Sequence, residues 1–190
     1  MKLLLSGFEP FLNNKINPSF EVLKKLPKDI DGNEINIIEL PVTFNESFKV
    51  LEKEIKVIKP DIVISFGLAA GREAISLEST AYNLKKSSAP DNNGIIFENE
   101  EIVKGANKEI KTSFKIDETI TNIGSKDIKV SNFPGYYVCN FVYYNVLFNE
   151  KKYGYKGLFI HVPTFESMDT LKMEDLIIKV IKELFKERSR

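Results

Sequence analysis

The stretch Asp61-Ile-Val-Ile-Ser-Phe66 decides the fold. Pro60 separates it from residues 46–59, where apolar side chains recur at helical spacing between lysines and glutamates. The six-residue run is apolar on both faces. Such runs are typical of strands that lie in a sheet covered by helices on both sides.

The same alternation of short apolar runs and helical patterns extends along the whole chain. We expect strands at 2–6, 35–41, 61–66, 74–82, 128–132 and 157–162. We expect helices at about 18–26, with Ser19 as its N-cap, and at 46–59, 117–123, 136–148 and 173–185. The polar residues 83–112 are expected to form a loop and a hairpin. This order predicts one α/β domain over residues 1–190, a three-layer α/β/α sandwich with a twisted, mostly parallel central sheet.

Composition excludes several classes of function. The 190 residues contain 27 Lys and Arg against 27 Asp and Glu, so the net charge is zero and no cationic excess favours nucleic acid or an acidic membrane. The single Cys and single His exclude an internal disulfide and a Cys/His zinc cluster, and we expect no metal or cofactor. Because no segment has the length of a signal-peptide core or a membrane span, we expect a cytoplasmic protein.

Three residues are candidates for catalysis. Cys139 falls near the start of the helix at 136–148, where free amides and the helix dipole stabilise a thiolate. His161 lies at the end of the strand at 157–162, where α/β enzymes place catalytic groups, and a Cys–His pair supplies a nucleophile and its base. Glu78 lies in an apolar segment and could orient the imidazole. The alternatives are a buried structural cysteine, a hydrogen-bonded core histidine and an exposed strand glutamate.

Two segments follow predicted strands and could border a site. Gly7-Phe-Glu-Pro-Phe11 has neither the glycine spacing of a dinucleotide loop nor the lysine of a P-loop. Its phenylalanines could cap the core or form the walls of an apolar pocket. Gly67-Leu-Ala-Ala-Gly-Arg72 could bring backbone amides close to a substrate, although it is weak evidence for a phosphate site.

Several segments together resemble one family, the type I pyroglutamyl-peptidases, which are also called pyrrolidone-carboxylate peptidases (cysteine peptidase family C15). No single segment is specific, but the set occurs in the order and spacing of the family along nearly the whole chain. The resembling segments are 7–11, Asn17-Pro18, Leu40-Pro41-Val42, 67–72, Ser76-Leu77-Glu78, Ala81-Tyr82-Asn83, Pro90-Asp91-Asn92, Val138-Cys139-Asn140 and 157–163.

The resemblance implies an α/β/α hydrolase that removes N-terminal pyroglutamate (5-oxoproline) from peptides through a thioester. It implies Glu78, Cys139 and His161 as the catalytic triad. It places the lactam ring between Phe8 and Phe11. The other implied substrate-binding residues are Asn17, Val42, Leu68, Tyr137 and Val138. It also implies pyroglutamyl peptides as partners and a homodimer or homotetramer.

The resemblance to the family is incomplete at the residues that would stabilise the oxyanion. Backbone amides near Cys139 and in the loop with Gly67 and Gly71 are candidates. The family usually has an arginine two residues before Pro-Asp-Asn, and this chain has Ser88 there, a single neutral donor instead of a guanidinium. Two alternatives therefore stay open: a weak or inactive relative that binds pyroglutamyl groups, and a cysteine amidase that acts on another lactam.

Overall fold

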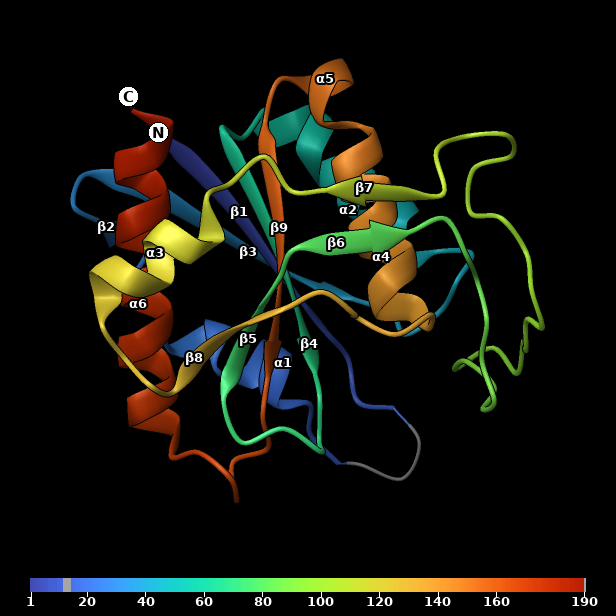
Figure 1. The fold of residues 1–190 in the computed structure, drawn as a ribbon, viewed down its shortest axis with the longest axis horizontal. Coiled ribbons are helices and arrows are strands. Elements are labelled where there is room, and N and C mark those ends of the chain that lie inside the picture. The colour runs from blue at the N-terminus through green and yellow to red at the C-terminus, as the bar shows by residue number, and fades with distance from the viewer. Residues whose placement is uncertain (12–14, 190) are drawn as a thin grey trace.

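The computed structural model describes residues 1–11 and 15–189 and has a seven-stranded sheet at its centre (Figure 1). All neighbouring strands are parallel except at two places: β2 is antiparallel to β3, and β5 is antiparallel to β9. The strands in spatial order are β2 (Asp29–Ile30), β3 (Asn33–Leu40), β1 (Lys2–Phe8), β4 (Ile62–Leu68), β9 (Lys156–Val162), β5 (Ile75–Glu78) and β8 (Ile128–Ser131).

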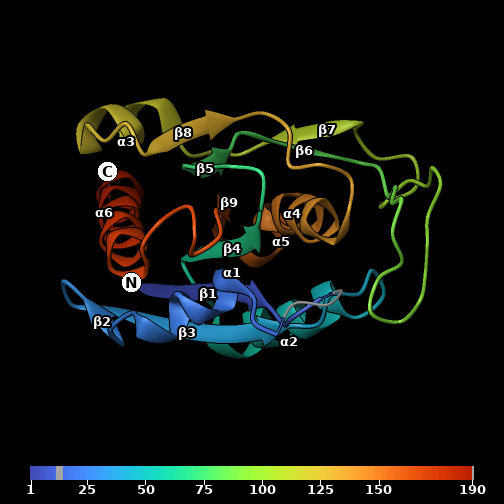
Figure 2. The same ribbon diagram turned by 90° about the horizontal axis from the view of Figure 1, so that it is seen from below.

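Helices cover both faces of this sheet. Figure 2 shows α3 and α6 on one side, and α2, α4 and α5 on the other. The helices are α1 (Pro18–Glu21), α2 (Ser47–Ile58), α3 (Ile116–Ile123), α4 (Val138–Phe148), α5 (Glu150–Tyr153) and α6 (Thr170–Arg188), with a 3₁₀ turn at Leu23–Lys25. The predicted α/β/α fold with a mostly parallel sheet is confirmed.

Strand β4 lies at the middle of the sheet and explains the two layers of core. Ile62 and Ile64 belong to the apolar cluster that contains α6, whereas Val63 belongs to the cluster that contains α4. All three side chains are fully buried or nearly so. Since apolar side chains alternate between the two faces, the strand is stable only where helices exclude water from both of them.

The first helix differs from the prediction. It ends after one turn, at Glu21, and its N-cap is Asn17 rather than Ser19: the Asn17 side chain accepts a hydrogen bond from the Ser19 amide at 3.1 Å. Proline is favoured at the first helical position, so Pro18 places the N-cap on the residue before it.

The segment expected as one strand at 74–82 is two strands that belong to different sheets. β5 joins the main sheet, and after Ser79 the chain enters β6 (Thr80–Tyr82), which pairs with β7 (Glu109–Lys111) in an antiparallel hairpin. The connection from β6 to β7 extends away from the main sheet in both views (Figures 1 and 2). It is tied to α4 by Asn140, whose side-chain amide forms hydrogen bonds with the backbone of Tyr82 and Leu84 at 2.8–2.9 Å.

Among the described helices, none is long and apolar enough to cross a membrane.

Candidate active site

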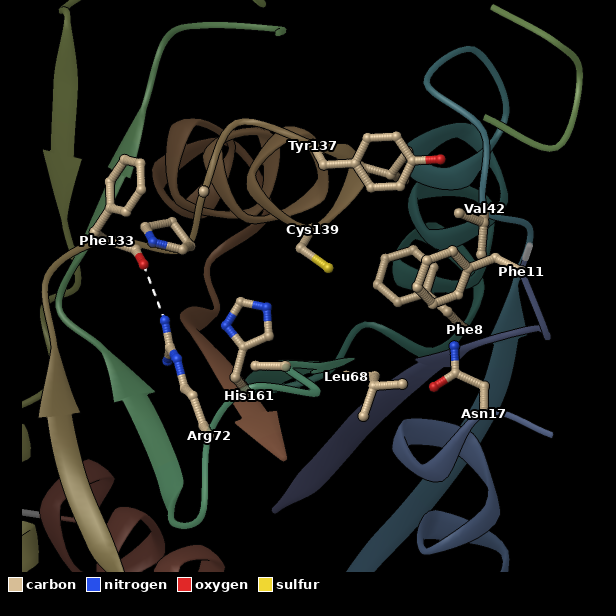
Figure 3. A pocket seen from close by; sticks show the side chains of 14 residues that line it. Phe8, Phe11, Asn17, Val42, Leu68, Arg72, Phe133, Tyr137, Cys139 and His161 are labelled. Carbon is tan, nitrogen blue, oxygen red and sulfur yellow. Dashed lines mark hydrogen bonds between the residues drawn. The ribbon is translucent and has the colours of Figure 1, made fainter. Parts of the chain in front are cut away.

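A cavity of about 330 Å³ opens at the carboxyl ends of β1, β4 and β9 (Figure 3). This volume is at the small end of the range for ligand pockets in proteins. Its described lining is Phe8, Phe11, Asn17, Val42, Leu68, Ala69, Arg72, Phe133, Pro134, Gly135, Tyr137, Val138, Cys139 and His161. The lining therefore joins Cys139 and His161 to the seven residues expected to bind the substrate.

Cys139 is the second residue of α4 and reaches the cavity because of two glycines. Gly135 has a φ of +80°, which turns the chain from β8 into the helix. Gly67 on β4 leaves room for the sulfur, since a methyl group there would lie 2.7 Å from Cys139 Sγ. The first turn of α4 has no side-chain cap, because its N-cap residue is Tyr137. The backbone amides beside the sulfur are thus left without a capping side chain.

His161 and Glu78 form a buried pair next to the cysteine. His161 Nδ1 lies 2.7 Å from Glu78 Oε1, and both side chains are at most 5% exposed. The antiparallel register of β5 and β9 aligns Glu78 with Phe159, two residues before His161. The main chain of Glu78 is held as well, since Tyr143 donates its hydroxyl to the Glu78 carbonyl oxygen at 2.6 Å. With Nδ1 engaged by the carboxylate, Nε2 is the ring nitrogen left for the cavity.

Arg72 connects this pair to the loop that precedes Cys139. Its guanidinium donates to Glu78 Oε1 at 2.6 Å and to the carbonyl oxygen of Phe133 at 3.0 Å, the contact drawn in Figure 3. Sequence reasoning missed this role, because it considered only the backbone of the 67–72 loop. The one signal available was a lone arginine that ends a glycine-containing loop after a core strand.

The electrostatics of the site favour a neutral thiol and a neutral imidazole. Burial lowers the pKa of His161, although the hydrogen bond to Glu78 acts to raise it. Burial raises the pKa of the Cys139 thiol to about 12, and the negative charge of Glu78 adds to this effect. Burial also acts to raise the pKa of Glu78, but the interactions with His161, followed by those with Ser131 and Arg72, outweigh it and hold this pKa below its usual value. The backbone amide at the start of the helix acts to lower the pKa of Cys139, as expected, but burial acts in the opposite direction and is the larger effect.

The other end of the cavity is apolar and has one polar group. Phe8, Phe11, Val42 and Leu68 line this end of the cavity together with Asn17 (Figure 3). The Asn17 amide oxygen accepts from the amide and the hydroxyl of Ser19 at 3.1 and 2.9 Å, while its nitrogen donates to the Glu9 carbonyl oxygen at 2.9 Å. Among the described residues, none accepts from the second N–H of Asn17, so this side chain can donate to a ligand carbonyl, whereas its oxygen is already engaged.

Tyr137 and Val138 also line the cavity, as expected, and the Tyr137 hydroxyl donates to the Pro90 carbonyl oxygen at 2.9 Å. Two of the three oxyanion candidates lie elsewhere. Gly71 is exposed and does not line the cavity. Ser88 is exposed too, and it lines a neighbouring groove. Phe133 and Pro134 were not expected in the wall of the cavity.

The fold and this cavity define the class: a hydrolase of the cysteine type, built on an α/β/α sandwich. Comparison with known proteins gives the family. The model of the pyroglutamyl peptidase family matches residues 1–179, and the chain belongs to this family. The resemblance inferred from the ordered motifs is thereby confirmed.

Individual relatives agree with this assignment. The chain is 41% identical over 172 residues to the pyrrolidone-carboxylate peptidase of Pyrococcus furiosus, with 86% of this chain and 81% of the relative covered. It is 38% identical over 200 residues to that of Brachyspira hyodysenteriae, with 98% of each chain covered. A crystal structure of the Pyrococcus furiosus pyrrolidone carboxyl peptidase superposes with a TM-score of 0.94 at 34% identity, covering 99% of this chain and 100% of the other.

Proposed function

We propose that this protein hydrolyses the amide bond after an N-terminal pyroglutamyl residue, with Cys139 as nucleophile, His161 as general base and acid, and Glu78 as the group that orients the imidazole. One observation carries the proposal. A single cavity holds the cysteine and the histidine at one end and a small apolar chamber at the other, and its described lining contains no carboxylate. An aminopeptidase needs an anionic group for the substrate α-amine, whereas pyroglutamate has no basic amine to bind.

The chamber suits a flat, uncharged lactam. Phe8 and Phe11 offer aromatic faces to the ring, and the second N–H of Asn17 is placed to donate to the lactam carbonyl. Arg72 is the one charged residue in the described lining, and its ion pair with Glu78 neutralises it. Burying the ring therefore requires no desolvation of an unpaired charge.

The neutral thiol and imidazole set the order of proton transfers. His161 Nε2 takes the thiol proton as Cys139 Sγ bonds to the carbonyl carbon, and the Glu78 carboxylate stabilises the imidazolium through Nδ1. The C–N bond then breaks as Nε2 returns the proton to the leaving amine, which leaves a pyroglutamyl thioester. Water adds to the thioester carbonyl and gives a proton to Nε2. Pyroglutamate departs as that proton returns to sulfur.

The backbone amides at the start of α4, among them that of Cys139, are the donors we assign to the oxyanion. They belong to a helix end without a side-chain cap, next to the sulfur. Removing one oxyanion donor lowers rates by about 100- to 1000-fold in enzymes that use such donors. Ser88 is not needed in this arrangement, because it lies outside the cavity.

The test compares two fluorogenic substrates, pyroglutamyl-aminocoumarin and prolyl-aminocoumarin, under reducing conditions. The prolyl ring has the same size but carries a charged amine and lacks the lactam carbonyl. We expect release from the pyroglutamyl substrate alone, and no release by the Cys139→Ala variant. Equal release from both substrates, or full activity of the variant, would refute the proposal.

Two further properties belong to the same proposal. A homodimer or homotetramer, as the family resemblance implies, would appear as two or four times the chain mass in light scattering, and a monomeric active enzyme would contradict it. A cytoplasmic location fits the reduced state that Cys139 requires, since this residue must stay a free thiol. Fractionation of the source cells tests that point.

A further inference from the structure

A second groove begins where the catalytic cavity ends. It shares four lining residues with the cavity, namely Phe11, Phe133, Gly135 and Tyr137, and continues to residues 86–89. Phe133 is 47% exposed although it is aromatic. The centre of its ring lies 5.0 Å from that of Tyr136 in an edge-on contact. The groove therefore has an aromatic wall that continues from the cavity.

The direction of the scissile bond leads the substrate into this groove. With the lactam ring between Phe8 and Phe11, its exocyclic carbonyl points to Cys139, and the leaving amine lies on the side of His161, which must protonate it. In Figure 3, Phe133 lies on the His161 side of the cavity, opposite the two phenylalanines. The residue that follows pyroglutamate thus enters the groove along Phe133.

Lys86 gives this groove a positive charge. Its main-chain amide donates to the Tyr136 carbonyl oxygen at 3.1 Å, which fixes Lys86 beside the chain three residues before Cys139. Within the described part of the chain, the Lys86 ammonium forms no ion pair. The neighbouring Lys85 is occupied, since its ammonium lies 3.2 Å from Glu100 and 3.8 Å from the centre of the Phe97 ring.

We propose that the groove formed by Phe133, Tyr136 and Lys86 binds the residue after the scissile bond, and that it selects a large apolar residue whose carboxylate pairs with Lys86. The favoured substrates are pyroglutamyl dipeptides with a free C-terminus, such as pyroglutamyl-phenylalanine. The groove is continuous with the cavity, so its aromatic wall can contact the side chain of the residue after the scissile bond. The positive charge of Lys86 favours a substrate carboxylate over a neutral amide. The inference rests on the proposed function and adds its substrate class.

The experiment measures kcat/KM for three substrates: pyroglutamyl-phenylalanine, its C-terminal amide, and pyroglutamyl-alanine. Release of the amine is followed with an amine-reactive fluorophore. The Lys86→Gln variant should lower the acid-to-amide ratio by about 3-fold, the size expected of a solvent-exposed ion pair. Added salt should lower the same ratio in the wild-type protein. Lys53→Gln, on the exposed face of α2, is the matched control and should leave the ratio unchanged.

A second variant tests the aromatic wall of the groove. Phe133→Ala should lower the preference for phenylalanine over alanine by about 5-fold, as expected for the loss of one aromatic contact. Its carbonyl bond to Arg72 belongs to the main chain and is retained. If every substrate is cleaved but neither ratio changes in its variant, the leaving residue lies in solvent and the groove proposal is wrong. If no substrate is cleaved, the proposed function itself fails.

Discussion

Replacing Arg72 tests whether its positive charge, through Glu78, sets the activity and the pH dependence of the site. The guanidinium is 30% exposed in its side chain, while the carboxylate of Glu78, which it contacts at 2.6 Å, is fully buried. Hydrogen bonds to charged groups contribute about 1.5–3 kcal/mol, and partial solvent exposure favours the lower half of that range. We therefore expect Arg72→Gln to lower kcat by about 30-fold, which corresponds to about 2 kcal/mol.

The pH profile distinguishes a positioning role from general destabilisation. The positive charge of Arg72 lowers the pKa of His161, and its hydrogen bond to Glu78 lowers the pKa of that carboxyl. Catalysis needs neutral His161, so activity is lost as pH falls through the His161 pKa. Without Arg72 both pKa values rise, and the acid limb of kcat/KM should move to higher pH.

Arg72→Lys is the matched control. It keeps the positive charge but lacks the second guanidinium nitrogen that donates to the Phe133 carbonyl oxygen. The acid limb of this variant should stay near that of the wild type, while kcat falls. The assay is a pH series with pyroglutamyl-aminocoumarin, with circular dichroism at each pH to confirm folding. A wild-type acid limb and a kcat within twofold in folded Arg72→Gln would refute the role of Arg72.

Three further predictions concern the same site. The wild-type kcat/KM should rise with pH through a pKa below 6.5, where His161 becomes neutral, and should show no alkaline limb up to about pH 10, because the thiol pKa is raised to about 12; an alkaline limb near neutrality would indicate a preformed thiolate–imidazolium pair instead. Gly67→Ala places a methyl group 2.7 Å from Cys139 Sγ and 2.9 Å from Phe159, so activity should fall by at least about 100-fold. In the control variant Gly71→Ala the added methyl group meets nothing within 4 Å, so activity should be kept; equal activities of the two variants would contradict the close approach of the sulfur. Ser88→Arg should change kcat/KM on pyroglutamyl-aminocoumarin by less than about 5-fold, since Ser88 lies outside the cavity and exposed charges have small effects. A larger gain would show that an arginine at this position contributes to catalysis.

The apolar pattern of the sequence predicted most of the sheet. Runs such as 61–66 and 157–162 became β4 and β9, because apolar residues on both faces leave a chain few places except between two layers of helices. The sequence contains no comparable pattern that predicts whether a strand runs parallel or antiparallel to its neighbour. That β5 runs antiparallel to β9 depends on the path of the chain after β4, and this direction brings Glu78 to the inner side of His161.

The site was predictable in its residue types but not in its electrostatics. The order of the motifs pointed to Cys139, His161 and Glu78. The structure places Cys139 and His161 in the wall of one cavity and buries Glu78 against His161. The thiol pKa depends on how deeply α4 buries its first turn, which is a tertiary property that outweighs the local helix end. The contacts of Arg72 likewise join residues 72, 78 and 133, and no local pattern specifies that arrangement.

The central claim is that Cys139 carries the pyroglutamyl group during turnover. The most direct test is to mix the enzyme with the 4-nitrophenyl ester of pyroglutamic acid, quench in acid within the first turnover, and measure the intact mass and the modified peptide. Because this leaving group departs without protonation, acylation should outrun hydrolysis of the thioester. We predict a mass increase of one pyroglutamyl group, located on Cys139 and absent from Cys139→Ala. Turnover of the ester with the label on another residue, or with no label at all, would contradict the mechanism.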